Sequence, residues 1–226
     1  YVLIDQILDY SKTGAAGFEV RFKEMGGEIV GKDNFQNQDV SIATQITKLK
    51  KVIDKVDCIY LSSIPPGGGS AIRQIRAAGI DLPIISPGAM GGDLWMKATP
   101  NLSNFYVVNY GSIYGDDPRP LFNDMVKYVA TKCPVVDSEL VTAYSVGEAF
   151  FLAIERAKGK TDGDSLKKAL EAFKDEPFLT GAITFTPEMH ASQGRDVYIT
   201  QSVDGKVSYL EKVELGAIPN LKDFLK

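Results

Sequence analysis

The side chains that could carry catalytic or metal chemistry in this chain are few and lie far apart. The single histidine, His190, stands in a polar loop, with no cysteine or second histidine at the spacing of a zinc site. A serine–histidine–aspartate triad would have to use the same histidine, and no GxSxG turn precedes it. We therefore expect His190 to be an exposed loop residue, and we expect neither a metal site nor a hydrolase.

The acidic pairs and the glycine-rich segment give no catalytic constellation either. Asp116-Asp117 and Asp175-Glu176 fall in predicted loops, where they are solvated and lack the shielding that tunes a general acid. Gly67 to Ser70 opens a helix after a strand, where free backbone N–H groups could hold an anion. The spacing of its glycines matches neither of the nucleotide-binding patterns GxGxxG and GxxxxGK(S/T). The alternative to an anion site is a tight turn in which the glycines let the backbone approach its neighbours closely. The sequence predicts a protein that is not an enzyme and needs no cofactor.

The composition is that of a globular protein without a nucleic-acid partner. The 226 residues are 44% hydrophobic and 24% charged, and the net charge is −4. This negative balance favours neither nucleic acid nor an anionic membrane, and no apolar run approaches the length of a membrane span. Two cysteines, Cys58 and Cys133, do not make a disulfide framework, and whether they pair stays open.

The stretch from Cys58 to Gly88 predicts the unit around which the chain is organised. An apolar run, a Pro/Gly-rich turn, an amphipathic segment and a second apolar run follow one another, as in a β-α-β unit of a parallel sheet. Ligands bind at the carboxyl ends of such strands. The ends are Ser62, Ser63 and Ile64 on the first strand and Ser86 to Gly88 on the second, and we expect both to line a cleft.

Strands and helices alternate over residues 1–108, which predicts an open parallel α/β sheet. Besides the central unit, the pattern predicts strands at 1–4, 28–31 and 104–108, a polar loop at 32–38, and helices at 11–25, from 41 and at 93–98. After a Gly/Asp/Pro-rich crossing at 111–120, it predicts helices at 121–133, 138–158 and 164–173, a strand at 181–185 and a hairpin at 197–210. These later helices are too apolar to stand alone, so we expect them to need a second sheet.

The order of the segments resembles the type I periplasmic binding proteins, in the branch that serves ABC importers of branched-chain amino acids. The stretches that carry the resemblance are VLIDQILDYSKTGAAGFEVRFKEMGGEIVG, DCIYLSS, IRQIRAAGIDLPIISPGA, AYSVGEAFFLAIERAKG, LTGAITFTPE and YITQSVDGKV. Such proteins trap a ligand between two α/β lobes. The resemblance implies that 1–112 and 194–213 form the family's complete second lobe, that 113–193 form the helical part of a first lobe whose sheet and N-terminal part are absent, and that 214–226 form a tail.

The resemblance also implies ligand-binding residues. A loop tyrosine of the amino-acid binders matches Tyr10, and an aromatic residue on the next strand-end loop matches Ile64. The acidic residue that pairs with a ligand ammonium matches Gly88, so we expect an uncharged or anionic ligand rather than a plain α-amino acid. Asp93 stands close behind Gly88 and Glu139 matches a ligand-facing position, so either could supply the absent carboxylate.

The implied partners are a small-molecule ligand, the membrane permease of an ABC importer, and an N-terminal segment of the same protein. The ligand would be an amino acid or a related small polar or carboxylate compound. The implied location is periplasmic or otherwise extracytoplasmic, with or without a lipid anchor. A ligand-sensing regulator or receptor domain on the same fold is the alternative, because a fold does not fix a function. Ligand identity and oligomeric state stay open.

Overall fold

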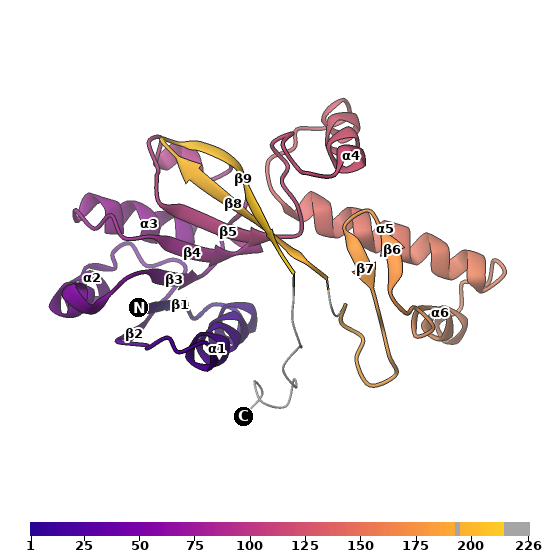
Figure 1. The fold of residues 1–226 in the computed structure, drawn as a ribbon, viewed down its shortest axis with the longest axis horizontal. Helices are drawn as coiled ribbons and strands as arrows, with labels where there is room; N and C mark the ends of the chain where they lie inside the picture. Colours follow the sequence, from indigo (N-terminus) through magenta and orange to yellow (C-terminus); the bar gives the residue numbers. More distant parts are fainter. Residues whose placement is uncertain (193–194, 215–226) are drawn as a thin grey trace.

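The computed structural model describes residues 1–192 and 195–214, and its centre is one seven-stranded sheet (Figure 1). The strand order is β2-β1-β3-β4-β5-β8-β9. The parallel strands are β1 (Val2–Asp5), β2 (Lys32–Phe35), β3 (Ile59–Ser62), β4 (Ile84–Pro87) and β5 (Phe105–Asn109). The hairpin of β8 (Val197–Val203) and β9 (Lys206–Val213) adds antiparallel to β5. The predicted open α/β sheet is confirmed.

Helices cover both faces of this sheet. α2 (Ala43–Val52) and α3 (Gly67–Ala77) share a buried cluster with Leu3, Ile59 and Leu61, whereas α1 (Asp9–Glu24) shares one with Val2 and Tyr60. Successive residues of a strand point to opposite faces, so a strand covered on both faces is apolar at nearly every position. This explains why the inner strands read as continuous apolar runs in the sequence.

The edge strand β2 lies four residues later than the sequence predicted. The predicted strand at 28–31 and the predicted loop at 32–38 are therefore wrong. In β2 the side chains of Asp33 and Phe35 are buried, while those of Lys32 and Asn34 are exposed. The buried Asp33 carboxylate accepts hydrogen bonds from the Tyr1 hydroxyl and from Lys48. Because the acidic Asp33 occupies a buried position, the sequence of this strand does not show the usual alternation of apolar and polar residues.

The glycine-rich segment belongs to the first turn of α3. A Cβ on Gly67 would lie 2.6 Å from the backbone oxygen of Asn37, and one on Gly68 would lie 2.5 Å from the sulfur of Met90. The glycines therefore allow this helix to approach its neighbours closely, which supports the close-approach alternative over the anion site.

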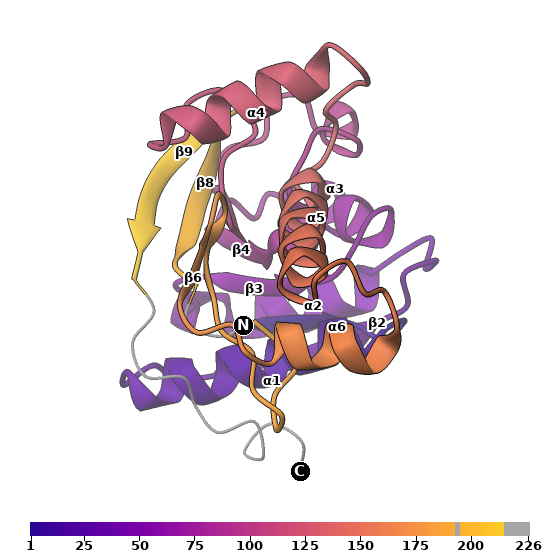
Figure 2. The same cartoon turned by 90° about the vertical axis from the view of Figure 1, so that its right-hand side faces the viewer.

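The second part of the chain contains three helices and a small sheet. The helices are α4 (Pro120–Ala130), α5 (Glu139–Arg156) and α6 (Gly163–Leu170), and Figure 2 shows α5 between the other two. β6 (Glu176–Phe178) pairs antiparallel with β7 (Gly181–Ile183), so a strand was missed beside the predicted one. Short 3₁₀ turns are η1 (Ile53–Lys55), η2 (Gly88–Met90) and η3 (Met96–Ala98), and only η3 remains of the helix predicted at 93–98.

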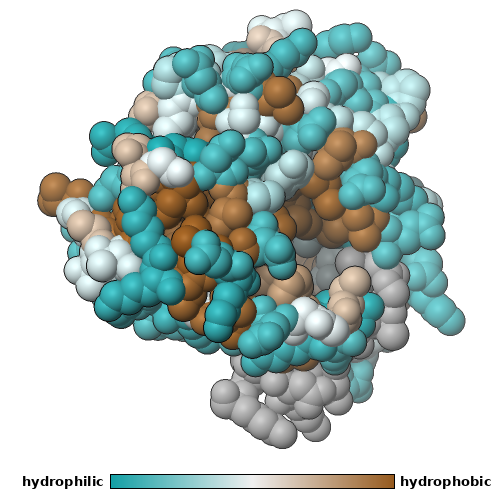
Figure 3. All heavy atoms as spheres, turned by 60° about the vertical axis from the view of Figure 1, so that its left-hand side comes forward, coloured by the Kyte–Doolittle hydropathy of each residue, from teal (hydrophilic) through white to brown (hydrophobic). Residues whose placement is uncertain are grey.

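The helices of the second part keep large apolar side chains exposed. On α5, Val146 is 62% exposed and Phe151 is 74% exposed, although Val141 on the same helix is buried. On the face drawn in Figure 3, apolar side chains gather in patches beside a recess rather than spreading evenly. Apolar exposure that is grouped in this way is typical of a surface that meets another layer or a ligand.

Three further sequence features can be placed. Cys58 is half-buried, Cys133 is exposed, and both are free thiols, so the two do not form a disulfide. Within residues 1–192 and 195–214, no helix is long and apolar enough to cross a membrane. The predicted tail lies, apart from Glu214, outside the described residues.

Candidate functional site: a cleft at the strand ends

A cleft of about 820 Å³ opens at the carboxyl ends of β4 and β5. One wall is built by the sheet and its loops: Tyr10, Gly88, Ala89, Asn109 and Tyr110. The other wall comes from the start of α5 and from the beginning of β8 with the segment before it: Ser138, Glu139, Thr142, Arg195 and Val197. Open parallel sheets bind their ligands at this edge, so the cleft is the candidate functional site.

Hydrogen bonds hold the loops that form the cleft. The backbone N–H of Ala89 donates to the Tyr10 hydroxyl at 3.3 Å, which ties the first helix to the loop after β4. The Ser138 hydroxyl donates to the Gly88 carbonyl at 2.9 Å, which joins the two walls. Burial, with a contribution from the Glu139 carboxylate, raises the pKa of the Tyr10 hydroxyl. Tyr10 therefore stays protonated at neutral pH and offers a hydrogen-bond donor to a ligand.

The base of the cleft is aromatic and apolar. The rings of Tyr60 and Phe18 lie parallel, with their centres 4.0 Å apart, and Ile85 and Val108 complete this surface. Burial raises the pKa of Tyr60 to about 12, so this hydroxyl is also neutral at physiological pH. Such a surface suits the hydrocarbon part of a small molecule, while a few polar groups at the rim would fix its orientation.

Three charged side chains line the cleft: Arg21, Glu139 and Arg195. Arg21 is paired with Glu24 at 3.1 Å on the same helix. Among the described residues, neither Glu139 nor Arg195 has an oppositely charged side chain within 4.0 Å. The cleft thus offers one guanidinium and one carboxylate that no described residue neutralises.

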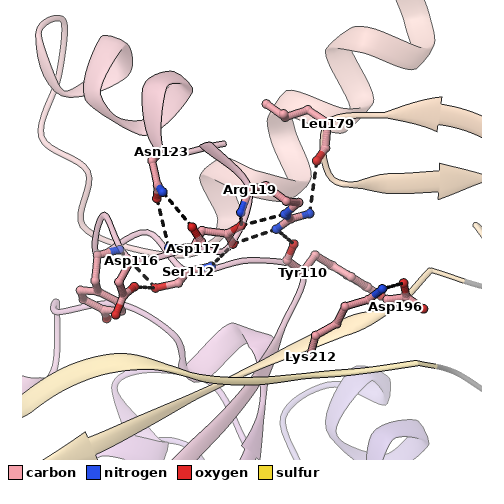
Figure 4. A network of polar contacts seen from close by, with 10 residues as sticks. Tyr110, Ser112, Asp116, Asp117, Arg119, Asn123, Leu179, Asp196 and Lys212 are labelled. Carbon is pink, nitrogen blue, oxygen red and sulfur yellow. Dashed lines mark hydrogen bonds and ion pairs between the residues drawn. The ribbon is translucent and has the colours of Figure 1, made fainter. Parts of the chain in front are cut away.

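A buried network at the crossing between the two parts fixes Tyr110 (Figure 4). The Arg119 guanidinium donates to the Asp117 carboxylate at 2.7 and 2.8 Å, to the Tyr110 carbonyl at 2.9 Å and to the Leu179 carbonyl at 3.2 Å. It also lies 3.9 Å from the centre of the Tyr198 ring. The expectation of a solvated pair is wrong for Asp117, whose side chain is fully buried because this network satisfies its charge.

The predicted ligand-binding residues fall into two groups. Tyr10, Gly88 and Glu139 line the cleft. Ser62 and Ser63 do not: both are fully buried, and their hydroxyls donate to the Ser11 carbonyl at 2.7 Å and to the Asp5 carboxylate at 2.8 Å. The expectation that these two serines line the cleft is therefore corrected, because the strand ends they occupy are closed by neighbouring loops.

Ile64 and Asp93 also stand outside the residues that line the cleft. Ile64 is half-buried, and its carbonyl accepts a hydrogen bond from the Asn37 amide at 3.0 Å. Asp93 is exposed and accepts one from the Tyr114 hydroxyl at 3.2 Å. The expectation that Ile64 lines the cleft is corrected as well, and Glu139 is the better placed of the two substitute carboxylates.

Sequence reasoning missed several residues of the cleft. Asn109 is the last residue of β5 and Tyr110 follows it, so the strand-end rule that selected Gly88 could have found them. No sequence signal marks Arg195, which stands in an irregular segment before β8. His190 is exposed, as expected, and its Nε2 lies 2.8 Å from the Glu171 carboxylate. In the described part of the chain, no cluster of three His, Cys, Asp or Glu could hold a metal ion.

Known proteins resemble this chain over most of its length. A Leu/Ile/Val-binding protein of Rhizobium johnstonii is 23% identical over 177 residues, which cover 78% of this chain and 47% of that protein. The isoleucine-bound branched-chain amino acid transporter substrate-binding protein LivJ of Streptococcus pneumoniae is 26% identical, with a TM-score of 0.74 over 95% of this chain and 59% of that one. A benzoate-bound solute-binding protein of an ABC transporter from R. palustris is 18% identical, with a TM-score of 0.72 over 93% of this chain and 57% of that one.

The chain is shorter than these relatives. It spans about half the length of the curated relative and about three-fifths of the two solved proteins. The two TM-scores show that the chain shares their fold. Residues 1–206 match the family described as periplasmic binding protein. Since this match covers most of the chain, the chain belongs to the periplasmic binding protein family.

Proposed function

We propose that this chain is the ligand-holding part of a solute-binding protein of an ABC importer, which captures a small molecule without changing it chemically. The observation that carries the proposal is the cleft itself, whose two walls come from different parts of the chain and meet through the Ser138–Gly88 hydrogen bond. The two solved relatives are named as binding proteins of transporters, which favours transport over ligand sensing by a regulator. An extracytoplasmic location and a membrane permease as partner follow from the same proposal.

The proposed ligand is a small compound with a carboxylate and an apolar body. The aromatic and aliphatic base of the cleft suits the apolar body, and the unpaired guanidinium suits the carboxylate. A Cβ on Gly88 would lie 3.2 Å from the Asn109 side-chain oxygen, so the wall is tight where relatives are expected to carry an acid. Glu139 then remains the carboxylate on the cleft surface. We propose that an uncharged or anionic ligand is preferred, and that an ammonium is bound only through Glu139.

The proposed complete binding protein has a second sheet over the helices of 113–193. Apolar side chains on α5 are exposed in this chain, and an exposed apolar helix face is stabilised by burial against another layer. The solved relatives are longer, and about two-fifths of their length is not matched here. We propose that an α/β segment of the same protein covers this face and completes the first lobe, with 1–112 and 194–213 as the second lobe.

Thermal melting of the natural-length protein against a small-molecule panel tests this function. The panel should contain aliphatic and aromatic carboxylates, their amides, amino acids and sugars. A ligand present at 100 times its Kd stabilises the folded state by about 2.7 kcal/mol, which shifts the melting temperature by several degrees.

Two tyrosine variants locate the site. Tyr10→Ala should abolish the ligand-induced shift, because Tyr10 lines the cleft. Tyr128→Ala is the matched control, since Tyr128 is exposed on α4 outside the cleft, and it should keep the shift. A full shift in Tyr10→Ala, or no shift with any class of compound, would contradict the proposal.

A further inference from the structure

Arg195 differs from the other guanidinium of the cleft, because no acidic side chain among the described residues pairs with it. Arg21 is neutralised by Glu24, whereas Arg195 has no ion pair within residues 1–192 and 195–214. Its Nε is buried and, in the same part of the chain, has no hydrogen-bond acceptor. A buried charged donor without a partner is unfavourable, and an anion that reaches it would remove that cost.

The surroundings of Arg195 hold the guanidinium in one place. Its central carbon lies 3.9 Å from the centre of the Tyr110 ring, and its Nη1 donates to the Thr180 hydroxyl at the long distance of 3.4 Å. Tyr110 is itself fixed, because its carbonyl accepts from Arg119. A guanidinium stacked on a ring keeps its N–H edge free for an acceptor in its own plane, which is the geometry of a two-bond contact with a carboxylate.

The position of Arg195 gives it access to the ligand. It lines the strand-end cleft and, together with Thr142, also lines an adjoining pocket of about 320 Å³ between α5 and β7. The apolar base of the cleft lies beside it, so an anionic head group at Arg195 would leave the body of the ligand over Tyr60 and Phe18.

We propose that Arg195 binds the carboxylate of the ligand and thereby selects anionic over neutral solutes. This inference rests on the proposed function, since it assumes that the cleft takes up a small molecule. The competing role is structural: Arg195 would only hold Tyr110 and Thr180 together. The two roles differ in one measurable property, because a structural clamp does not distinguish a carboxylate from the amide of the same shape.

The experiment measures calorimetric binding of matched pairs by the natural-length protein. The probes are benzoate with benzamide and 4-methylpentanoate with its amide. The variants are Arg195→Gln, Arg195→Lys and, as the matched control, Arg73→Gln, because Arg73 is exposed on α3 and lies outside the cleft. Melting without ligand confirms that each variant is folded.

We expect the wild type to prefer each carboxylate over its amide. Arg195→Gln should weaken carboxylate binding by at least about 30-fold, equivalent to about 2 kcal/mol, and leave amide binding unchanged. Arg195→Lys should retain part of the preference, because a charge without the planar fork makes a weaker contact. Arg73→Gln should keep the preference of the wild type.

Two results would overturn the inference in distinguishable ways. If Arg195→Gln keeps the wild-type ratio of carboxylate to amide affinity, Arg195 is a structural residue, while the proposed solute binding stands. If the wild type binds neither these pairs nor any compound of the wider panel, the proposed function fails and the inference fails with it.

Discussion

The exposed apolar face of α5 gives the sharpest test of the proposed covering sheet. Val146 lies on that face and is 62% exposed, so about two-fifths of it is buried in the chain as described. Complete burial of a valine is worth about 1.5–3 kcal/mol, so its present contribution is about 0.5–1 kcal/mol. Val146→Lys should therefore cost this 226-residue chain no more than about 1 kcal/mol, since the ammonium can reach solvent.

The same substitution should be far more damaging in the natural-length protein. If a sheet covers α5, the rest of the Val146 surface is buried there and adds about 1–2 kcal/mol to its contribution. A lysine under that sheet would also leave an ammonium without a partner, which costs several kcal/mol more. We expect Val146→Lys to lower the free energy of unfolding by at least about 3 kcal/mol more in the natural-length protein than in the 226-residue chain.

Urea unfolding followed by circular dichroism measures this difference in both forms. Val40→Lys is the matched control for an exposed position, because Val40 is 94% exposed, and it should be neutral in both forms. Val141→Lys is the control for a buried position, because Val141 is 1% exposed, and it should be severe in both. Equal effects of Val146→Lys in the two forms, to within about 0.5 kcal/mol, would refute the proposed covering sheet.

Three further substitutions probe the cleft and its support. Glu139→Gln should abolish binding of leucine but not of 4-methylpentanoate in calorimetry, because only leucine carries an ammonium; equal losses would contradict the role of Glu139. Burial raises the pKa of Tyr60 to about 12, so above pH 10 the unfolded state releases this proton first. The stabilisation from the raised pKa of Tyr60 is complete below pH 10 and is lost towards pH 12, and it amounts to about 2–3 kcal/mol. Urea unfolding at pH 9 and pH 11 measures this loss. The free energy of unfolding should fall less between the two pH values in Tyr60→Phe than in the wild type. Arg119→Met should cost about 3 kcal/mol, because the buried Asp117 carboxylate loses its cationic partner and keeps only the backbone N–H groups of Ser112 and residue 119. The double variant with Asp117→Asn should recover most of this loss; no recovery would show that packing dominates.

The strands that the sequence predicts well are those buried on both faces. β3 and β4 are apolar at nearly every position, because α1 covers one face of the sheet and α2 and α3 cover the other. β2 fails for the opposite reason: it is an edge strand, and one of its two buried side chains is Asp33. That carboxylate is satisfied by Tyr1 and Lys48, which lie elsewhere in the chain. A local pattern cannot show that an acid will find such partners.

The residues of the candidate site could also be predicted from the sequence only in part. The strand-end rule locates the correct edge of the sheet, but it does not say which strand ends stay open. Ser63 stands at such an end and is nevertheless enclosed, since its hydroxyl contacts Asp5, 58 residues earlier. Arg195 is found only in the folded chain, because its neighbours Tyr110 and Thr180 come from two other segments.

The contacts across the cleft also suggest what a ligand adds to this protein. The walls are joined by the Ser138 hydroxyl on the Gly88 carbonyl, by the Asp93 N–H on the Val136 carbonyl at 2.8 Å, and by the Arg195 guanidinium over the Tyr110 ring. The charged groups that face the interior, Glu139 and Arg195, form no ion pair with each other or with other described residues. A hydrogen bond stabilises a structure by only about 0.5–1.5 kcal/mol, so these contacts alone hold the two walls together weakly. Under the proposed function, a bound solute supplies the contacts that the walls do not make with each other, and its binding energy can hold them together.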